Sequence, residues 1–392
     1  MSIDSRRDIL RGLFEVAVAA VDPETLVSDK WTDEGEGKVT LIAIGKASAA
    51  MCRGAARRIE QLNGICVAIA QDEVPEGIDL IVGDHPIPGE GSFRAGRRVL
   101  EVAKRAPGKI VALISGGGSA LCEFPIPGLS PQFITETNQV LVSSGASIAE
   151  TNLVRRHLSA IKGGGLTKAA GRPIDTYLIS DVCGADPSVI ASGPTIPGAA
   201  DIDAAISIMN DHGIDVPASV EDAMRSVPNR AGEAGAIRVI GDGRTAAVAA
   251  LAAAHAHAMS ASVLSGWLHG PLASSLDEFM TEAGPGITIA TGEPDVAVIG
   301  DGRGGRNTHA ALLAAQRLAG TDRVFAAFAT DGVDGNSSSA GAIVDGTTVS
   351  RGGDPRPALQ RYDSATYLRA TGDLVETGPT GTNVSDLWLL SQ

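Results

Sequence analysis

The chain has 392 residues, enough for two or three domains with sizeable hydrophobic cores. Its net charge of -14 argues against nucleic acid or an anionic membrane as a partner, because both bind basic surfaces. No apolar run approaches the roughly 20 residues of a transmembrane helix, and the four cysteines lack the CxxC spacing of a zinc site. We therefore expect a soluble, cytoplasmic protein whose function depends on a local site.

Short β-branched runs alternate with helical sequence in the first part of the chain. The predicted strands cover residues 39–44, 65–70, 79–83, 109–114 and 175–179, and a helix is expected from about residue 48. Strands that are apolar throughout and separated by helices are typical of a parallel sheet covered on both faces. The predicted fold class is therefore α/β.

A polar stretch with Pro and Gly, residues 226–236, is the expected linker between two domains. After it the pattern predicts a strand at 237–241, a long Ala-rich helix, a hairpin within 287–300, a helix from residue 307, and strand-like runs at 324–330 and 341–350. We expect two α/β domains, covering residues 1–230 and the smaller 237–392.

Polar and glycine-rich clusters follow the predicted strands, at the end of an open α/β sheet where ligands bind. Lys46 follows the first strand, Ser115 to Ser119 follow residues 109–114, Ser180 and Asp181 follow residues 175–179, and Asp331 and Asp334 follow residues 324–330. A ligand site is expected where these clusters meet.

Three interpretations apply to the loop formed by Ser115, Gly116, Gly117, Gly118 and Ser119. A nucleophile elbow requires GxSxG with histidine and acid partners, and the second glycine is missing here. Glycines after a strand also let backbone N–H groups approach the oxygens of a phosphate. The third interpretation is a tight turn without a ligand.

Lys46 lies beside Gly45, where it is well placed to meet an anion, although a lysine after a strand is most often a solvated charge. The P-loop pattern GxxxxGK[ST] is absent, because Thr40 stands five residues before Gly45. If ATP binds, its cradle is of another type.

A second glycine cluster contains Gly300, Gly302 and Gly305, which satisfy GxGxxG between an apparent strand and an apparent helix. This pattern is consistent with a dinucleotide site. Arg303 and Arg306 place two guanidinium groups in the same loop, which suits a transferring phosphoryl group better than a diphosphate.

Pairs of aspartates lie in two loops. Asp331 and Asp334 could hold Mg²⁺ through their oxygens, or Asp331 could cap a following helix. Asp181 and Asp186 offer a similar choice within residues 180–194. We favour the ligand role for the first pair, because a turn alone leaves its second aspartate unexplained.

Basic side chains near other motifs are further candidates. His85 and His157 are candidates for substrate contacts. Arg155, Arg156 and Lys162 form a positive cluster next to three glycines, which fits a solvated helix face and an anion-binding role about equally well.

Nine motifs resemble, in order, those of the class II glycerate 2-kinases, a family with a Rossmann-like amino-terminal domain and a smaller α/β MOFRL domain. They are GKASAAM, GDHPIP, LISGGGSAL, RRHLSAIKGGG, LISDVCGADPSVIASGPT, TGE, GRGGRN, TDGVDG and TGPTGTNVSDL. The resemblance covers nearly the entire chain. It implies phosphorylation of D-glycerate at the 2-hydroxyl by ATP and Mg²⁺, giving 2-phosphoglycerate, in a cleft between the domains. A related short sugar acid is an alternative acceptor.

The resemblance also implies roles for individual residues. Lys46 and Arg306 correspond to the catalytic cations. The family's glycine loop falls on Ser115 to Ser119, and its TDG-DG loop falls on Asp331 and Asp334. We expect substrate or nucleotide contacts from Ser115, Gly116, Gly117, Gly118, Ser119, Lys162, Ser180, Gly304, Gly305, Asn307, Asp331 and Asn383. As our own hypothesis, we expect Asp181, Asp186 and Asp334 to be the metal ligands.

Several positions differ from the family's pattern. Ala185 and Gly165 stand where the family commonly has an aspartate and an arginine, Thr308 and His309 replace the last two residues of GRNQE, and an acidic residue is missing within 336–339. Two other classes of function stay open. The GxGxxG pattern suggests an NAD(P)H-dependent hydroxypyruvate reductase, and the changes at Ala185 and Gly165 suggest a sugar-acid sensor without turnover. A homodimer is kept as a possible assembly.

Overall fold

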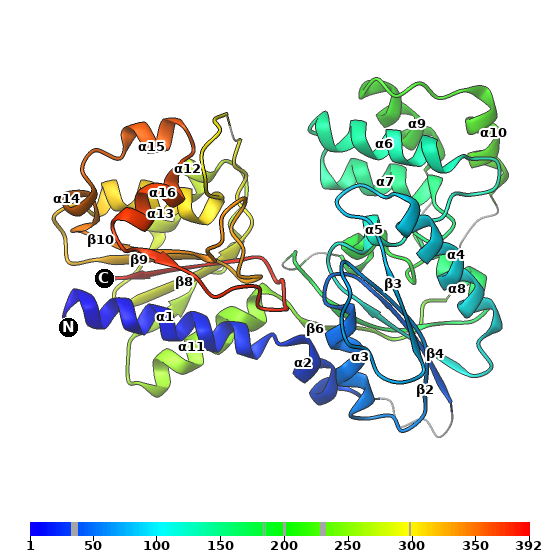
Figure 1. Ribbon diagram of the computed structural model, residues 1–392, viewed down its shortest axis with the longest axis horizontal. Coiled ribbons are helices and arrows are strands. Elements are labelled where there is room, and N and C mark those ends of the chain that lie inside the picture. Colours follow the sequence, from blue (N-terminus) through cyan, green and yellow to red (C-terminus); the bar gives the residue numbers. More distant parts are fainter. Residues whose placement is uncertain (33–37, 183, 185, 199–200, 228–232, 298) are drawn as a thin grey trace. The chain divides into compact units, whose positions relative to one another are not determined.

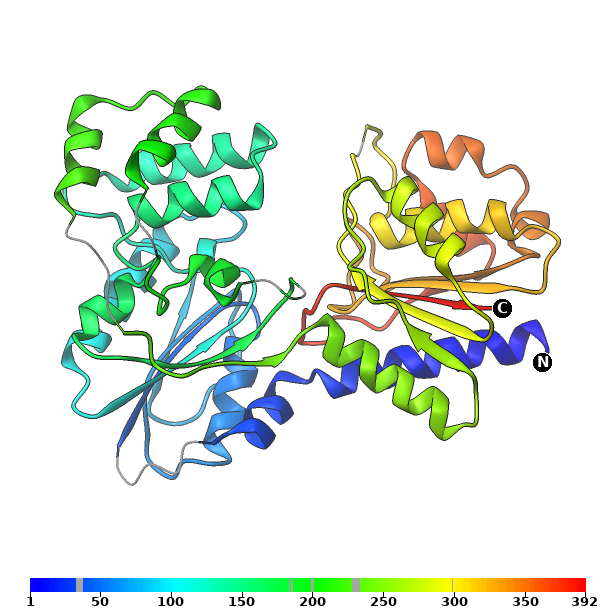
Figure 2. The same cartoon turned by 180° about the vertical axis from the view of Figure 1, so that it is seen from behind.

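The structure is a computed structural model that describes residues 1–32, 38–182, 184, 186–198, 201–227, 233–297 and 299–392. They form two compact units. We call residues 23–180 with 184–240 the amino-terminal unit, and residues 1–22 with 181–183 and 241–392 the carboxy-terminal unit. Figures 1 and 2 show the elements of each unit from opposite sides. Residues 228–232 of the expected linker lie outside the described residues.

The sheet of the amino-terminal unit has six strands in the order β3-β2-β1-β4-β5-β6. They are β1 (Val39–Ile44), β2 (Leu62–Ala68), β3 (Ile78–Val82), β4 (Lys109–Ile114), β5 (Asp175–Ile179) and β6 (Ile237–Gly241). Strand β1 runs parallel to both β2 and β4, β2–β3 and β4–β5 are also parallel, and all six residues of β1 are buried. This order is that of a Rossmann-like sheet, as expected from the resemblance.

Helices cover both faces of this sheet, with α3 on one side and α4 with α8 on the other (Figures 1 and 2). A separate group of four helices, α6, α7, α9 and α10, has its own apolar core that includes Ile134, Val154 and Met209. The helices of the unit are α2 (Pro23–Lys30), α3 (Ser48–Ala56), α4 (Glu90–Arg105), α5 (Gly118–Leu121), α6 (Pro131–Ser143), α7 (Ile148–Leu158), α8 (Gly165–Ala170), the 3-10 helix η1 (Pro187–Ser192), α9 (Ile202–Asp211) and α10 (Ala218–Ser226).

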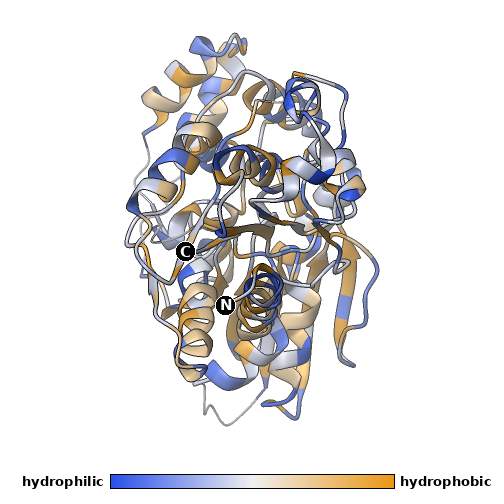
Figure 3. Cartoon of the chain, turned by 90° about the vertical axis from the view of Figure 1, so that its left-hand side faces the viewer, coloured by the Kyte–Doolittle hydropathy of each residue, from blue (hydrophilic) through white to orange (hydrophobic). Residues whose placement is uncertain are grey.

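The carboxy-terminal unit contains a mixed sheet in the order β11-β10-β9-β12-β8-β7. Its strands are β7 (Ala261–Val263), β8 (Ile287–Gly292), β9 (Val324–Ala329), β10 (Gly341–Asp345), β11 (Leu374–Val375) and β12 (Asp386–Ser391). Only the β7–β8 pair among those given is parallel; β12 runs antiparallel to both β8 and β9. The strands are mostly orange in Figure 3, in keeping with their hydrophobic side chains.

Two helices, α1 and α11, lie side by side on one face of the mixed sheet, and α12, α13 and α16 lie on the other (Figures 1 and 2). The helices of the unit are α1 (Ile3–Ala20), α11 (Gly243–Ala256), α12 (Leu272–Glu282), α13 (Arg306–Leu318), α14 (Thr348–Gly352), α15 (Arg356–Gln360) and α16 (Ser364–Ala370). No helix in the described part of the chain combines the length and apolar character needed to cross a membrane.

Helix α1 belongs to the carboxy-terminal unit, although its place in the sequence predicts that it is part of the first domain. Phe14 stacks on Phe328 of β9 with ring centroids 4.2 Å apart. Arg7 forms ion pairs with the buried carboxylates of Asp345, at 2.6 Å, and Asp373, at 2.8 Å. These contacts span more than three hundred positions of sequence, so a reading of neighbouring segments could not find them.

The hairpin expected within residues 287–300 is not seen in the described part of that range, which leaves out residue 298. Strand β8 ends at Gly292 and pairs with β7 and β12, which come from elsewhere in the chain. The apolar run after it includes Ile299, which is 84% exposed, so hydrophobicity alone was misleading there.

Candidate functional site

The order of the parallel sheet reverses between β1 and β4, which is where open α/β sheets bind ligands. Lys46 follows β1, and the loop Ser115–Ser119 follows β4. The two connections are tied together: the Lys46 backbone N–H donates to the Gly116 carbonyl oxygen at 2.9 Å, and the Ala47 N–H donates to Ser115 Oγ at 3.0 Å. Tertiary structure therefore joins two of the expected site segments.

Several hydrogen-bond donors at this point have no acceptor. Within the described residues, the backbone N–H groups of Gly116, Gly117 and Gly118 donate no hydrogen bond, and the exposed Lys46 ammonium group has neither a hydrogen-bond nor an ion-pair partner. Amide groups left free next to a lysine form a site for an anion. Ser115 is used differently, because its hydroxyl group holds the loop against Ala47.

Gly117 brings the lysine and a histidine together. Its φ of +81° is a left-handed conformation, and a Cβ atom there would lie 3.0 Å from Lys46 Cγ and 3.4 Å from His85 Cδ2. The pKa of His85 is lowered, first by partial burial of the ring and then by the positive charges of Lys46 and Arg155. Burial and the two neighbouring cations therefore all favour the neutral form of the imidazole.

Helix α7 adds further polar groups next to the loop. Its Asn152 accepts a hydrogen bond from Ser192 Oγ at 2.5 Å, and Ser192 Oγ is 2.7 Å from Ser119 Oγ. Ser192 and its neighbour Ala191 have φ values of 59° and 50°, a backbone conformation that costs free energy for residues other than glycine. Strain of this kind is typical of functional sites.

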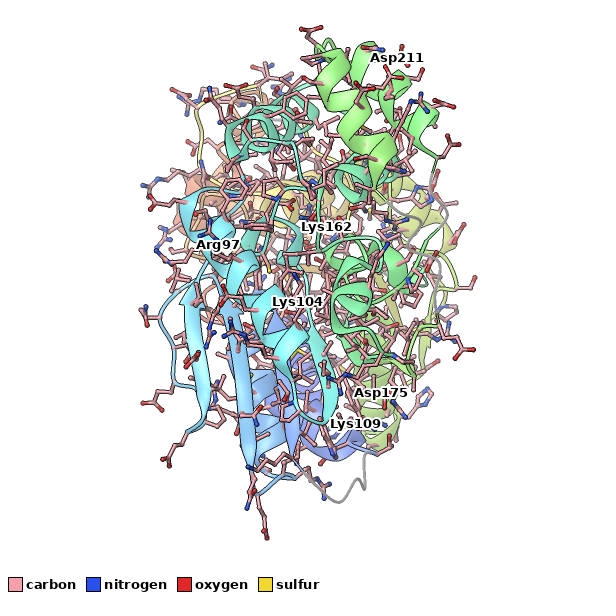
Figure 4. All side chains as sticks on the ribbon, turned by 90° about the vertical axis from the view of Figure 1, so that its right-hand side faces the viewer. Arg97, Lys104, Lys109, Lys162, Asp175 and Asp211 are labelled. Carbon is pink, nitrogen blue, oxygen red and sulfur yellow. The ribbon has the colours of Figure 1, made fainter. Side chains whose placement is uncertain are left out.

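Lys162 lies in the interior instead of at the expected anion site. Lys162, labelled in Figure 4, is 1% exposed. Its ammonium group forms an ion pair with the equally buried Glu123. Burial lowers the pKa of Lys162, and Glu123 opposes this shift. Arg155 and Arg156, by contrast, are only partly buried. The three cations that lie close together in the sequence therefore have different environments in the structure.

The carboxy-terminal unit contains a second candidate site, a pocket of about 320 Å³. It is formed at the start of α13 by the connections after β8, β9 and α15 and before β12. The expected site residues that line it are Gly304, Gly305, Arg306, Asp331, Asp334 and Asn383.

Arg306, the first residue of α13, is held by two carboxylates. Its Nε donates to Asp386 at 2.6 Å, and its Nη2 donates to Glu293 at 2.7 Å. Burial lowers the pKa of the guanidinium group, but the two carboxylates outweigh it and raise that pKa. Burial raises the pKa of Asp386 to about 7, which Arg306 opposes. The result is an oriented, permanently charged guanidinium group at the pocket wall.

Asp334 caps helix α13. One of its carboxylate oxygens accepts from the N–H groups of Gly305 (3.0 Å) and Thr308 (2.7 Å), and the other accepts from the Asn307 N–H at 2.9 Å. Burial raises the pKa of Asp334, and these hydrogen bonds oppose the shift. The expected metal ligand is thus engaged by the backbone at a helix N-terminus.

Asn307 connects Asp334 and Asp386, because its side-chain amide donates to both carboxylates. Its fully buried side chain donates from Nδ2 to Asp386 at 2.8 Å and accepts from the Trp388 indole at 3.0 Å. We expected a ligand contact here, and the structure shows an internal support for Asp386 and Arg306.

The GxGxxG loop differs from a dinucleotide-binding loop. The helix N-terminus that would meet the diphosphate is occupied by Asp334. A Cβ atom on Gly302 would lie 2.5 Å from the Arg361 carbonyl oxygen and from the Asp363 backbone nitrogen. The Gly302 N–H also donates to that carbonyl group at 3.1 Å. These glycines allow the chain to pack against itself.

The remaining predicted residues are dispersed. Ser180 is buried at the end of β5, and Asp181 lies in the carboxy-terminal unit. Asp186 is exposed in the amino-terminal unit and caps η1 by accepting from the Ser188 N–H at 2.9 Å, which lowers its pKa. The described residues contain no group of three or more His, Cys, Asp or Glu side chains suited to a metal ion. Ala185 lies outside the described residues.

Sequence reasoning did not assign a role to several pocket residues. Asp386 and Glu293 occur in the motifs TGPTGTNVSDL and TGE, so their positions were visible but not their contact with Arg306. His309, one of the departures from GRNQE, stacks on Tyr362 with ring centroids 4.7 Å apart, and both line the pocket.

Comparison with known proteins identifies the relatives of this chain. Residues 9–225 match a domain of unknown function, DUF4147, and residues 286–386 match the MOFRL family. The chain is 38% identical to an Agrobacterium vitis protein whose provisional name is hydroxypyruvate reductase, over 98% of this chain and 94% of that protein. It is 32% identical to the D-glycerate 2-kinase of Thermotoga maritima, over 98% of each chain.

A solved structure agrees with this relationship. The crystal structure of glycerate kinase from Thermotoga maritima superposes with a TM-score of 0.90, at 32% identity, and covers 99% of each chain. The fold agrees over nearly the whole chain, and the two domain models match in sequence order. The chain therefore belongs to the glycerate 2-kinase family, with a DUF4147 domain followed by a MOFRL domain.

Proposed function

We propose that this protein is a glycerate 2-kinase that transfers the γ-phosphoryl group of ATP to the 2-hydroxyl of D-glycerate. The observation that carries this proposal is a group of hydrogen-bond donors at the sheet's switch point that have no acceptor among the described residues. They are the amides of Gly116 to Gly118, beside Lys46. Its relatives named as glycerate 2-kinases supply the substrate class. Because ATP is made and used in the cytoplasm, we propose a cytoplasmic location.

The residues of the amino-terminal unit bind and neutralise anionic groups in this proposal. Lys46 and the amides of Gly116 to Gly118 stabilise negative charge on the transferring phosphoryl group, where catalysis depends on positioning and electrostatics. Ser115 keeps the two connections at a fixed separation through its hydrogen bond to Ala47. No nucleophilic side chain is needed, because the 2-hydroxyl oxygen itself attacks the γ-phosphorus. The bond from that phosphorus to the ADP oxygen breaks, and the hydroxyl proton is released to solvent.

The residues of the carboxy-terminal unit supply a second oriented cation. Asp386 and Glu293 fix the guanidinium plane of Arg306. Fixed donors stabilise developing charge without reorganising during the reaction. Asn307 acts through Asp386, to which it donates at 2.8 Å, and so it is a positioning residue.

The carboxylates of the pocket fit Mg²⁺-ATP, but Asp331 fits the role of metal ligand better than the expected Asp334. Asp331 would hold Mg²⁺, because its carboxylate is half-buried at the pocket and only its Oδ1 is seen to accept, from the Val333 N–H at 3.0 Å. Asp334 fits less well, because three backbone N–H groups engage both its oxygens. Mg²⁺, when bound, neutralises phosphate charge and commonly takes only one or two protein carboxylates.

Hydroxypyruvate reductase is the second candidate, because relatives from Agrobacterium vitis carry that name. The capped helix N-terminus argues against it. A carboxylate already accepts from the amides that would have to meet a diphosphate, and a second anion there is repelled. Oxidation of NAD(P)H by hydroxypyruvate in the absence of ATP would support the reductase instead.

The deciding experiment measures ADP release with D-glycerate, ATP and Mg²⁺ in a coupled assay, with the product's phosphate position determined by NMR. We expect 2-phosphoglycerate. Lys46→Ala and Arg306→Ala should each lower kcat by about 10³-fold, a loss typical of removing a donor to a transition-state charge. Lys104→Ala, an exposed change on α4, is the control and should retain the parent rate.

The same samples separate a catalytic defect from misfolding. Both variants should keep the far-ultraviolet circular dichroism of the parent, because Lys46 is exposed and Arg306 is partly so. If both retain near-parent turnover, the assignment of the catalytic cations is wrong. If a panel of short sugar acids shows a better acceptor than D-glycerate, the reaction class stands and the acceptor changes.

A further inference from the structure

Arg155 on α7 is a half-buried cation whose charge is not neutralised by a direct ion pair among the described residues. Its Nε donates to Asn138 Oδ1 at 2.6 Å, and Asn138 is itself fixed by a 2.8 Å hydrogen bond from Nδ2 to the Ile134 carbonyl oxygen. Glu123, the acidic group whose charge acts on Arg155, is engaged by Lys162. The Arg155 guanidinium group is therefore oriented by an amide, while its two terminal nitrogens have no acceptor in the described structure.

This guanidinium group belongs to the same site as the glycine loop. Arg155 and Lys46 both act on His85, and the His85 ring lies against Gly117. One turn earlier on α7, Asn152 accepts from Ser192, which contacts Ser119. Residues three positions apart share a helix face, so the guanidinium group and the chain of amide and hydroxyl groups face the same region.

The chemistry of this set matches a small hydroxy acid. Two terminal guanidinium nitrogens form a fork that pairs with both oxygens of a planar carboxylate. The partly exposed Ser119 hydroxyl can bond to a substrate hydroxyl, while the fully buried Ser192, held by Asn152, supports Ser119 from the interior. A partly buried cation without a counterion is costly unless a ligand neutralises it.

We infer that Arg155 binds the carboxylate of the acceptor acid, and that Asn138 positions its guanidinium group for this contact. The inference deepens the proposed function and rests on it for the identity of the acid. The loop amides and Lys46 remain assigned to the phosphoryl group. The two anions of the reaction thus have separate cations within one region of the amino-terminal unit.

Kinetics of Arg155→Gln test the inference. We expect kcat/KM for D-glycerate to fall by about 100-fold, as for loss of a hydrogen bond between charged groups, with KM for ATP within about twofold of the parent. Glycerol has no carboxylate, so whatever rate the parent has with glycerol should be unchanged in the variant, and the preference for glycerate over glycerol should fall. Arg105→Gln, an exposed change at the end of α4, is the matched control. Arg155→Lys should recover part of the loss, and Asn138→Ala should raise KM for D-glycerate less than Arg155→Gln does.

Binding measurements make the result independent of turnover. Calorimetry should show that Arg155→Gln loses affinity for D-glycerate but not for ADP or inorganic phosphate. In the parent, D-glycerate should raise the pKa of His85 observed by NMR, because an added anion offsets the two neighbouring cations. A parent-like affinity and preference for D-glycerate in a folded Arg155→Gln protein would overturn the inference while the kinase function stands. A parent that neither binds nor phosphorylates D-glycerate would overturn both.

Discussion

The two glycine-rich loops of this protein resemble each other in sequence and differ in structure. Each was expected to bind an anion, and each lies near a helix start with a basic residue close by. In the loop Ser115–Ser119 the backbone N–H groups of three glycines have no acceptor among the described residues. In the loop 300–305 a carboxylate, Asp334, takes up the amides at the start of α13.

The difference shows that glycine content alone does not identify an anion site. Gly117 creates space for Lys46 and His85, whereas Gly302 creates space for the protein's own backbone at Arg361. An anion site needs donors whose hydrogen-bonding capacity is left over after folding. Whether any is left over depends on residues that are distant in sequence.

The largest effect on stability is expected from replacing Lys162, the buried cation of the amino-terminal unit. Lys162→Ala should lower the free energy of unfolding by about 4 kcal/mol, because it leaves the Glu123 carboxylate buried without its partner. Calorimetry or denaturant unfolding measures this change, with the exposed Lys46→Ala as the control that should leave stability unchanged. Replacing both partners, as Lys162→Met with Glu123→Leu, should recover most of the loss. Equal effects of Lys162→Ala and Lys46→Ala would contradict the distinction between the two cations.

A matched pair of alanine substitutions compares the loops directly. Gly302→Ala should lower the free energy of unfolding by about 3 kcal/mol, since its Cβ atom would overlap the backbone of Arg361 and Asp363. Gly117→Ala should cost about 1 kcal/mol from the left-handed conformation and reduce activity more than stability, because its Cβ atom displaces Lys46. Unfolding curves and kcat for both variants provide the test. A large loss of activity with normal stability in Gly302→Ala would restore a ligand-binding role for the second loop.

The cap of α13 is tested by Asp334→Ala. Removing the carboxylate takes the acceptor from the N–H groups of Asn307 and Thr308, while the Gly305 N–H keeps its bond to Thr308 Oγ1. We expect the free energy of unfolding to fall by about 2 kcal/mol, at the upper end for helix caps. Thermal unfolding measures it. Activity measured as a function of Mg²⁺ concentration tests the alternative role. If Asp334 is instead a metal ligand, the variant will need much more Mg²⁺ for activity, and its stability will be unchanged. Asp331→Asn should show that metal dependence instead.

The smallest expected effect is the change of kcat/KM with pH. The pKa of Asp386 is raised to about 7 by burial, so its carboxyl group becomes protonated below that pH and loses the charge that holds Arg306. We expect kcat/KM to fall about tenfold between pH 7 and pH 6 or below, with little change above pH 8. Asp386→Asn should have lower activity and lack this acidic limb. An unchanged acidic limb in that variant would assign the titration to another group.

Much of the fold could be predicted because it depends on local pattern. Apolar runs such as residues 39–44 and 109–114 became β1 and β4, and parallel strands place their carboxyl ends at one edge. That geometry brought Lys46 next to the loop Ser115–Ser119. Order of motifs was also sufficient to identify the family.

Other features could not be read locally. Arg7 meets Asp345, and Arg306 meets Asp386 eighty positions later, so neither the placement of α1 nor the support of the guanidinium group is visible in neighbouring residues. The hairpin prediction was wrong for the same reason, because the partners of β8 come from distant segments.

The sequence by itself determined which residue types follow which strands, and hence the fold class, the family and the positions of Lys46 and the glycine loops. Only the tertiary structure decided which of those groups are available to a ligand. Asp334 reaches the start of α13 from 29 positions away and Glu123 neutralises Lys162 from 39 positions away, whereas no described carboxylate pairs directly with Lys46 or Arg155. The physical reason is that folding satisfies most polar groups with partners from elsewhere in the chain, and what it leaves unsatisfied is the site.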